Sequence, residues 1–131
     1  YLALAQGRFK KPFGLIKEPV KSFDRQKFNR FLKAKWAETE YRVLEQRNGY
    51  GLVEIFPETG RTNQIRIHFS GIGHPLLGER KYAFAKDFLL KFRRTALHAA
   101  SVAWRHPLTK KMIEVKAPLP EDMRLFMETH P

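Results

Sequence analysis

The stretch ETGRTNQIRIHFSGIGHPLLGERKYA, residues 58–83, contains one helix with turn signals at both ends. Thr62 lies where a side-chain oxygen can cap the first turn of a helix. Gly71 or Gly73, followed by Pro75, is typical of a helix end, because glycine adopts the left-handed conformation there and proline cannot continue the helix. The pattern therefore predicts a helix over residues 63–73.

One face of this helix is apolar, and the face beside it contains an arginine in an unfavourable place. A period of 3.6 residues brings Ile65, Phe69 and Ile72 together. An arginine close to the start of a helix opposes the helix dipole, so helix stability does not explain Arg66. A carboxylate or phosphate partner would explain it, and an incidental surface ion pair is the alternative. The neighbouring face consists of Asn63, Arg66, Ile67 and Ser70.

Strand patterns lie on both sides of the helix. TEYRVLEQ and GLVEIFPETG alternate in character and flank Asn48-Gly49, which is a strong hairpin signal. YLALAQG at the start of the chain is predicted to be a strand that ends at Gly7. LHAASVAWRHP and KMIEVKAP predict a second hairpin, and AKDFLLKFRR and PEDMRLFMETH predict two short helices. The fold class is α+β, a mainly antiparallel mixed sheet with flanking helices, and residues 1–131 form part or all of one domain.

Composition limits the partners that the chain is expected to have. The 131 residues contain 25 Lys+Arg and 13 Asp+Glu, which gives a formal net charge of +12. Such an excess attracts polyanions, so nucleic acid is the first partner to consider and an anionic membrane surface the second. No apolar run approaches the length needed to span a bilayer, and the chain contains no cysteine. These features fit a reducing compartment, and we expect a cytoplasmic protein.

Residues 8–36 are basic, and aromatic residues are interspersed among them. Pro12, Gly14 and Pro19 interrupt regular structure, so a loop or a loosely paired segment is expected. Lysine and arginine alternating with phenylalanine suit phosphate contact and base stacking. The alternative is that the phenylalanines fill the core while the lysines face water, and both descriptions can hold for different residues. The phenylalanines in question are Phe23, Phe28 and Phe31.

Several common sites are not indicated by the sequence. His68 and His74 lack the spacing of metal ligands, and cysteine is absent, so we expect no metal site. GIGHPLLG lacks the glycine spacing of the dinucleotide fingerprint and follows a predicted helix rather than a strand. HFSGIG is no nucleophile elbow, because a histidine stands where that motif has glycine.

Four segments, taken together and in order, resemble the RluA-type pseudouridine synthases. Residues 58–83 are similar to the family pattern G-R-T-H-Q-I-R-x-H…G-H-P-I-x-G-D-x-x-Y. LHAASVAWRHPLTKKMIEVKAPLPEDM resembles L-H-A…F-x-H-P…F-x-A-P-x-P-x-D. KAKWAETEYRVLE is similar to G-K-x-A-x-T-x-Y-x-V-L, and YLALAQG to Y-x-A-L-x-x-G. These matches cover nearly the whole chain.

The resemblance implies an isomerase that converts uridine to pseudouridine in rRNA or tRNA, without metal or cofactor. Such an enzyme breaks the N-glycosidic bond, turns the uracil and rejoins it through carbon. Tyr1 matches the family tyrosine that packs against the base, and Arg66 matches the basic residue that pairs with a catalytic aspartate. Leu97 falls where the family has an apolar residue beneath the site. An aromatic ring tolerates rotation of a flipped base, and a guanidinium holds a carboxylate ionised.

The chain departs from the family pattern in ways that limit this expectation. The motif R-L-D-x-x-T-S-G, which supplies the family's aspartate, does not occur, and Asp24, Asp87 and Asp122 are the only aspartates. We therefore expect the C-terminal part of a catalytic domain, inactive alone. Asn63 stands where the family usually has histidine, and Glu79 where it usually has aspartate; we expect Asn63 to keep a supporting role.

Two further functions remain as alternatives. A non-catalytic RNA-binding module would keep this scaffold without the aspartate. A basic domain that binds a membrane surface or a partner is less favoured, because AKDFLLKFRR is short for an amphipathic membrane helix. For RNA, we expect phosphate contacts that set affinity more than sequence choice, no membrane partner and a monomer. The candidate contacts are Arg61, Lys10, Lys11, Lys33 and Lys35.

Overall fold

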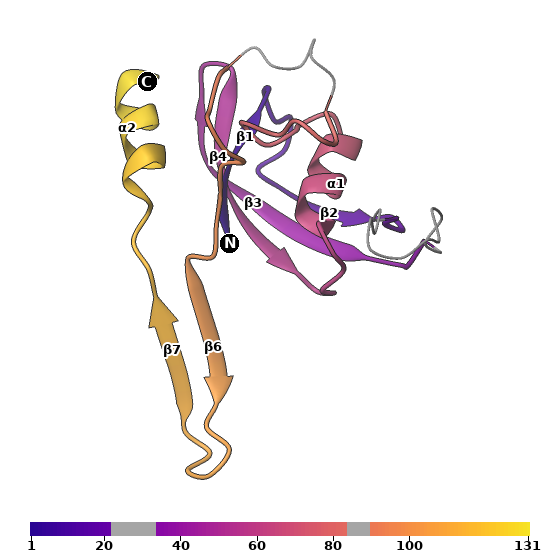
Figure 1. Ribbon diagram of the computed structural model, residues 1–131, viewed down its shortest axis with the longest axis vertical. Helices are drawn as coiled ribbons and strands as arrows, with labels where there is room; N and C mark the ends of the chain where they lie inside the picture. Colours follow the sequence, from indigo (N-terminus) through magenta and orange to yellow (C-terminus); the bar gives the residue numbers. More distant parts are fainter. Residues whose placement is uncertain (22–33, 84–89) are drawn as a thin grey trace.

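The computed structural model describes residues 1–21, 34–83 and 90–131. Its main body is a five-stranded antiparallel sheet with the strand order β2-β3-β4-β1-β5, and a separate two-stranded hairpin is formed by β6 and β7 (Figure 1). The elements in chain order are β1 (Leu2–Gln6), β2 (Phe13–Lys17), β3 (Glu38–Arg47), β4 (Tyr50–Pro57), α1 (Gln64–Gly71), β5 (Leu97–His98), β6 (Ser101–Arg105), β7 (Met112–Lys116) and α2 (Glu121–Thr129). The α+β class with a mainly antiparallel sheet is thus confirmed.

The hairpin of β3 and β4 forms the centre of the sheet. Its turn is the predicted Asn48-Gly49, and Gly49 adopts a φ of 85° that a side chain would disfavour. Tyr41 lies opposite Ile55, and the register shifts by one residue after Val43. The sheet therefore bends at a β-bulge, where local twist increases.

The first strand is buried on both faces because it lies between two cores. Ala3 and Ala5 face the core under α1, together with Phe69 and other residues. Leu4 faces the opposite core, which contains Tyr50 and the apolar side of α2. Because successive side chains of a strand point to opposite faces of the sheet, β1 contributes to both cores. The residues of the second core are Leu4, Tyr50, Leu77, Ala96, Met123, Phe126 and Met127.

Helix α1 is shorter than predicted, and its buried face differs in part. It begins after Asn63, which has a φ of 56° and makes no side-chain cap bond, so the prediction that Thr62 caps the helix is wrong. Ile65 and Phe69 are buried as expected, but Ile72 is exposed. The helix has ended before Ile72, and two polar residues occupy the buried positions instead.

These two polar residues, Gln64 and His68, bond to the sheet. Gln64 Nε2 donates to Glu38 O and to Thr39 Oγ1, both at 2.9 Å. His68 Nδ1 lies 2.7 Å from Thr39 Oγ1, and its Nε2 lies 2.8 Å from a backbone oxygen of the β2 region. Burial of these groups is tolerated because every polar atom named here is paired. His68 is therefore a structural histidine of the core.

Two segments differ from the secondary structure that was predicted for them. Residues 8–36 were expected to be a loop or loosely paired, and residues 13–17 of them form the edge strand β2, with Gly14 opposite Tyr41. Phe23, Phe28, Phe31 and Lys33 lie outside the described residues. Of the helix predicted for residues 85–94, residues 90–94 are described and are not helical. The hairpin of β6 and β7 and the terminal helix α2 are confirmed.

None of the described helices has the length and apolar character that crossing a bilayer requires.

Candidate active site

A cavity of about 280 Å³ opens where the start of β1 meets the end of β4 and the start of α1. Antiparallel pairing brings these elements together: the Tyr1 amine donates to Ile55 O at 2.9 Å, and Ala3 lies opposite Leu97. Five residues predicted from the sequence line this cavity. The lining consists of Tyr1, Pro57, Thr59, Gly60, Arg61, Asn63, Gln64, Ile65, Arg66 and Leu97.

Arg66 is held in place by a carboxylate of its own chain. Its Nε donates to Glu79 Oε2 at 2.6 Å, and its Nη2 donates to Glu79 Oε1 at 2.8 Å. Glu79 is completely buried, whereas 27% of the Arg66 side chain is exposed. Such a two-point contact fixes the plane of the guanidinium as well as its position.

Backbone groups complete the environment of Glu79. Its Oε1 accepts hydrogen bonds from the backbone N–H groups of Lys81 at 3.0 Å and Tyr82 at 3.3 Å. Burial by itself would raise the pKa of Glu79, but the bonds from Arg66 and from the backbone outweigh it and keep this pKa below its usual value. The same contact raises the pKa of Arg66. The pair is thus ionised near neutral pH.

Within the described residues, Arg66 pairs with a carboxylate of its own chain, Glu79. The expectation that Arg66 also faces an aspartate from an upstream segment stays a prediction. With Nε and Nη2 bonded to Glu79, Nη1 makes only a long contact of 3.4 Å to Asn63 Oδ1. Arg66 therefore retains donor capacity at the cavity that it lines.

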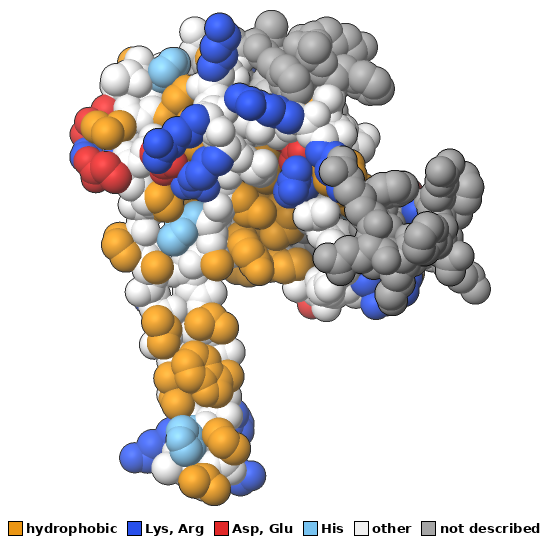
Figure 2. Space-filling view, viewed as in Figure 1, with side chains coloured by type: hydrophobic (Ala, Val, Ile, Leu, Met, Phe, Trp, Pro, Cys, Tyr) orange, Lys and Arg blue, Asp and Glu red, His pale blue; other side chains and the backbone are white. Residues whose placement is uncertain are grey.

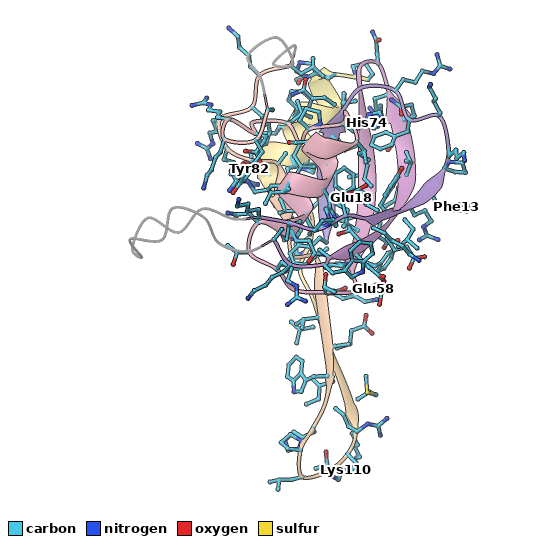
Figure 3. All side chains as sticks on the ribbon, turned by 90° about the vertical axis from the view of Figure 1, so that its right-hand side faces the viewer. Phe13, Glu18, Glu58, His74, Tyr82 and Lys110 are labelled. Carbon is cyan, nitrogen blue, oxygen red and sulfur yellow. The ribbon has the colours of Figure 1, made fainter. Side chains whose placement is uncertain are left out.

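Asn63 connects the cavity to a tyrosine that the sequence analysis did not single out. Its Nδ2 donates to the Tyr82 hydroxyl at 3.1 Å, and Arg66 Cζ lies 5.3 Å from the centre of the Tyr82 ring. A guanidinium over an aromatic face is electrostatically favourable. Tyr82 lies on the α1 side of the molecule, away from the hairpin (Figure 3). Its signal was the final tyrosine of the G-D-x-x-Y pattern.

Of the predicted phosphate contacts, Arg61 lines this cavity, and its Nε donates to Trp36 O at 3.0 Å. None of the described lysines among them does so. Lys10 and Lys11 line a separate, open cleft of about 1270 Å³ along β2, whose lining contains both basic and acidic side chains. Lys35 is exposed and its backbone forms a β-bridge with Val20, and Lys33 lies outside the described part of the chain. The charged residues of the cleft are Arg8, Lys10, Lys11, Lys17, Glu18, Glu38, Glu40 and Glu58.

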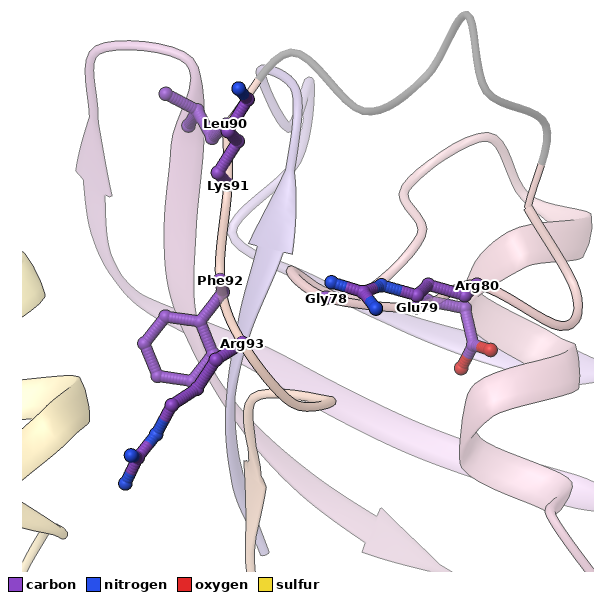
Figure 4. A pocket seen from close by; sticks show the side chains of 7 residues that line it. All are labelled: Gly78, Glu79, Arg80, Leu90, Lys91, Phe92 and Arg93. Atoms are coloured by element: carbon purple, nitrogen blue, oxygen red, sulfur yellow. The ribbon is translucent and has the colours of Figure 1, made fainter.

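A third cavity, of about 530 Å³, lies on the other side of the loop that carries Glu79 (Figure 4). Arg80, Lys91 and Arg93 make its lining basic. Among residues 1–21, 34–83 and 90–131, no group of three side chains is arranged to hold a metal ion.

The family model for RNA pseudouridylate synthase matches residues 1–71, which include Tyr1, Arg61, Asn63 and Arg66. The chain belongs to this family. The resemblance drawn from the four sequence segments is therefore confirmed at the level of family and fold.

Curated pseudouridine synthases are similar over almost the whole chain. The chain is 40% identical over 130 residues to the uncharacterized RNA pseudouridine synthase YlyB of Bacillus subtilis, covering 98% of this chain and 42% of that protein. It is 35% identical over 138 residues to the ribosomal large subunit pseudouridine synthase D of Blochmanniella floridana, covering 94% and 43%. The chain thus spans about two-fifths of the length of these relatives.

The solved structure of human RNA Pseudouridylate Synthase Domain Containing 1 has a similar fold. The two superpose with a TM-score of 0.74 at 25% identity, over 89% of this chain and 52% of the human chain. The fold described above thus corresponds to about half of the human chain.

Proposed function

We propose that this chain carries one part of the uridine-binding site of an RNA pseudouridine synthase. The observation that supports this is a single cavity lined by both Tyr1 and Arg66, with Leu97 beside them. In this proposal the Tyr1 ring packs against an everted uracil and Leu97 contributes an apolar wall. A ring face suits a base that must turn while it stays bound.

The charge of Arg66 serves the reacting carboxylate in this proposal. Glu79 orients the guanidinium from behind, and the aspartate of the family enters from a polypeptide segment outside this chain. A cation next to that aspartate lowers its pKa and keeps it ionised. A rigid guanidinium also holds the carboxylate in one orientation, which a flexible ammonium does less well.

The substrate in this proposal is RNA, with rRNA considered before tRNA. The name of the synthase D relative refers to the large ribosomal subunit, whereas the name of YlyB refers only to RNA. The first of these names favours rRNA. The net charge of +12 favours a polyanion, and Arg61, Lys10, Lys11 and Lys35 are the proposed phosphate contacts. We further propose that the parent enzyme works as a cytoplasmic monomer without a metal or cofactor.

The test is a chimera in which this chain replaces the matched region of Bacillus subtilis YlyB. We expect the chimera to form pseudouridine in large-subunit rRNA, and Arg66→Met to lower the rate at least about 100-fold, because a charge contact in a desolvated site is lost. Arg124→Met is the matched control, since Arg124 pairs on the exposed surface of α2. Arg66→Lys keeps the positive charge but removes the planar guanidinium, so its rate shows which of the two the site needs.

Three results would count against the proposal or a part of it. A chimera that binds RNA yet forms no pseudouridine would favour the non-catalytic RNA-binding module. Equal loss of rate in the Arg66→Met and Arg124→Met chimeras would remove Arg66 from the site. The 131-residue chain by itself is expected to form no pseudouridine, so turnover by this chain would contradict the need for an aspartate from elsewhere.

A further inference from the structure

Trp36 is an exposed aromatic residue for which the site described above has no use. It lies just before β3, and 52% of its surface is exposed. Tryptophan is highly buried on average, because its ring has a large apolar surface. Trp36 also belongs to the basic segment 8–36, whose aromatic residues suit base stacking. The ring is therefore available to a ligand from solution.

The indole is held in place by hydrogen bonds. Its Nε1 donates to Glu38 Oε1 at 3.0 Å, and the backbone oxygen of Trp36 accepts a bond from Arg61 Nε at 3.0 Å. Nε1 is the only polar atom of the side chain, so its bond orients the ring while the apolar faces stay free to make contacts. A ring that is ordered before binding loses less conformational entropy when a ligand contacts it.

Trp36 lies between the active-site cavity and the cleft along β2. Arg61, which is bonded to its backbone, lines the cavity, and Glu38, which is bonded to its ring, lines the cleft. The two hollows adjoin at residues 57–60: Thr59 lines the cavity, Glu58 lines the cleft, and both are hydrogen-bonded to Glu38. A polymer that extends from the cavity into the cleft therefore passes Trp36.

The surroundings of the ring fit a single-stranded nucleic acid better than a protein. Lys35 is exposed next to Trp36 in the chain, and Arg61 and Glu38 are the residues bonded to it. The core of a protein interface is depleted of such charges. Single-stranded RNA instead combines base stacking on aromatic rings with phosphate contacts to cations. Figure 2 shows Lys and Arg side chains close to hydrophobic ones on the body of the molecule.

We propose that Trp36 is a stacking platform for a base next to the target uridine in the RNA strand. The target uracil then occupies the cavity against Tyr1, a neighbouring base lies on the Trp36 ring, and Arg61 and Lys35 contact phosphates of the same strand. The inference rests on the proposed function, which supplies the RNA and the place of its target. Stacking on Trp36 can nevertheless be measured without pseudouridine formation.

Fluorescence of Trp36 reports on this contact directly. The chain contains two tryptophans, so Trp104→Phe leaves Trp36 as the only one. The probe is single-stranded oligouridine, which is suitable because base stacking on aromatic rings is tolerant of sequence. Inorganic polyphosphate is the control, since it carries negative charge without bases. We expect oligouridine to quench Trp36 emission, because a stacked base quenches an indole, and polyphosphate to leave the emission nearly unchanged.

Substitutions show whether the ring contributes to affinity. Trp36→Ala should weaken oligouridine binding at least about fivefold, as expected for the loss of one base stack, whereas Trp36→Phe keeps an aromatic face and should retain most of the affinity. Trp104→Ala is the matched control, because Trp104 is also exposed, at 43%, and its loss should change affinity less than about twofold. Equal affinity of all three variants for polyphosphate shows that fold and charge are kept.

The chimera with YlyB separates this inference from the proposed function. There, Trp36→Ala should raise the KM for RNA more than it lowers kcat, because stacking holds the strand both before and during the reaction. A chimera that forms no pseudouridine while oligouridine still quenches Trp36 would contradict the proposed function alone. Pseudouridine formation that depends on Arg66 but not on Trp36 would contradict the stacking platform alone.

Four further observations would overturn the stacking platform. The first is unquenched Trp36 emission at saturating oligouridine. The second is equal quenching by polyphosphate, which would indicate a response to charge rather than to bases. The third is equal loss of oligouridine affinity in Trp36→Ala and Trp104→Ala. The fourth is a change in Trp36 emission that depends only on the concentration of the chain, which would identify a second copy as the partner of the ring.

Discussion

Glu79 is a carboxylate with no exposed surface in a strongly basic chain. A buried charge is tolerated only when it is paired and hydrogen-bonded, and Glu79 has both Arg66 and two backbone donors. The same contacts that permit burial also fix the guanidinium at the cavity. Stability and site geometry therefore depend on the same atoms.

Removal of the cation should leave Glu79 uncompensated. Arg66→Met is expected to lower the free energy of unfolding by about 3 kcal/mol, since breaking one partner of a buried pair strands the other charge. Urea unfolding measures the change. Arg124→Met is the control, because Arg124 pairs with Glu121 and Glu128 on the surface, and it should leave the stability nearly unchanged. Comparable losses in the two variants would contradict the role given to burial.

The pKa of Glu79 also predicts a pH dependence. Its folded pKa lies below the unfolded value of about 4.3, so its contribution to stability is complete above that pH and is lost as the pH falls through the folded pKa. The free energy of unfolding, measured between neutral pH and pH values well below 4, should therefore decline on the acid side.

Glu79→Gln provides the check on this assignment. It should be less stable than the parent at neutral pH and show a smaller decline below about pH 4. Asp122, whose pKa is lowered mainly by its hydrogen bond with Arg94, should account for part of the decline that remains. An unchanged acid slope in Glu79→Gln would exclude Glu79 as its source.

Sequence alone could identify Arg66 as unusual but could not name its partner. The objection to a cation near a helix start is local, whereas the contact with Glu79 depends on how the loop after α1 returns to the helix. The final tyrosine of the G-D-x-x-Y pattern marked Tyr82, but its contact with Arg66 depends on the same return of the loop.

At the level of elements, the loop after α1 is fixed by a glycine. Gly78 has a φ of 79°, and a Cβ there would lie 1.8 Å from the backbone oxygen of Arg94. This close approach joins the loop that carries Glu79 to the segment before β5. No side chain fits without displacement of the backbone.

Gly78→Ala should accordingly destabilise the fold by at least about 2 kcal/mol, through strain and steric overlap. Gly71→Ala at the end of α1 is the matched control, because its added Cβ meets no atom within 4 Å. We expect that control to be neutral or to stabilise by up to about 1 kcal/mol. Thermal unfolding of the two variants gives the comparison, and similar melting temperatures would refute the argument.

Elements with a clear local sequence pattern were predictable. Features that depend on contacts with residues distant in the sequence were not. Alternation and the Asn48-Gly49 turn indicated β3 and β4, and the acidic start of residues 120–130 indicated α2. β2 was missed because Pro12 and Gly14 interrupt its pattern and β3 provides its pairing. The buried face of α1 was partly wrong, since the burial of His68 depends on Thr39.

For the whole molecule, the excess of 12 positive charges predicts binding to RNA that weakens as salt rises. Each phosphate contact contributes about 0.7 to 0.9 to the slope of log affinity against log salt. Lys10→Gln with Lys11→Gln removes two such contacts and should reduce the slope by up to about 1.4 to 1.8. Fluorescence anisotropy with labelled rRNA fragments at several salt concentrations measures it.

A lysine pair elsewhere serves as the control for this charge prediction. Lys110→Gln with Lys111→Gln removes the same charge at the remote end of the hairpin and should change the slope less (Figure 3). An equal change in both variants would mean that net charge, rather than the cleft along β2, governs binding. A slope near zero in the parent chain would indicate a different partner.

The position of β1 between β4 and β5 also determines when the protein can fold during synthesis. β1 is made before either neighbour, and β5 starts at residue 97. At about 5 to 20 residues per second, the ribosome needs roughly 5 to 20 s to deliver it. Until then, an apolar nascent strand has an unpaired edge. The order of translation thus creates a period in which chaperones can determine the yield of native protein.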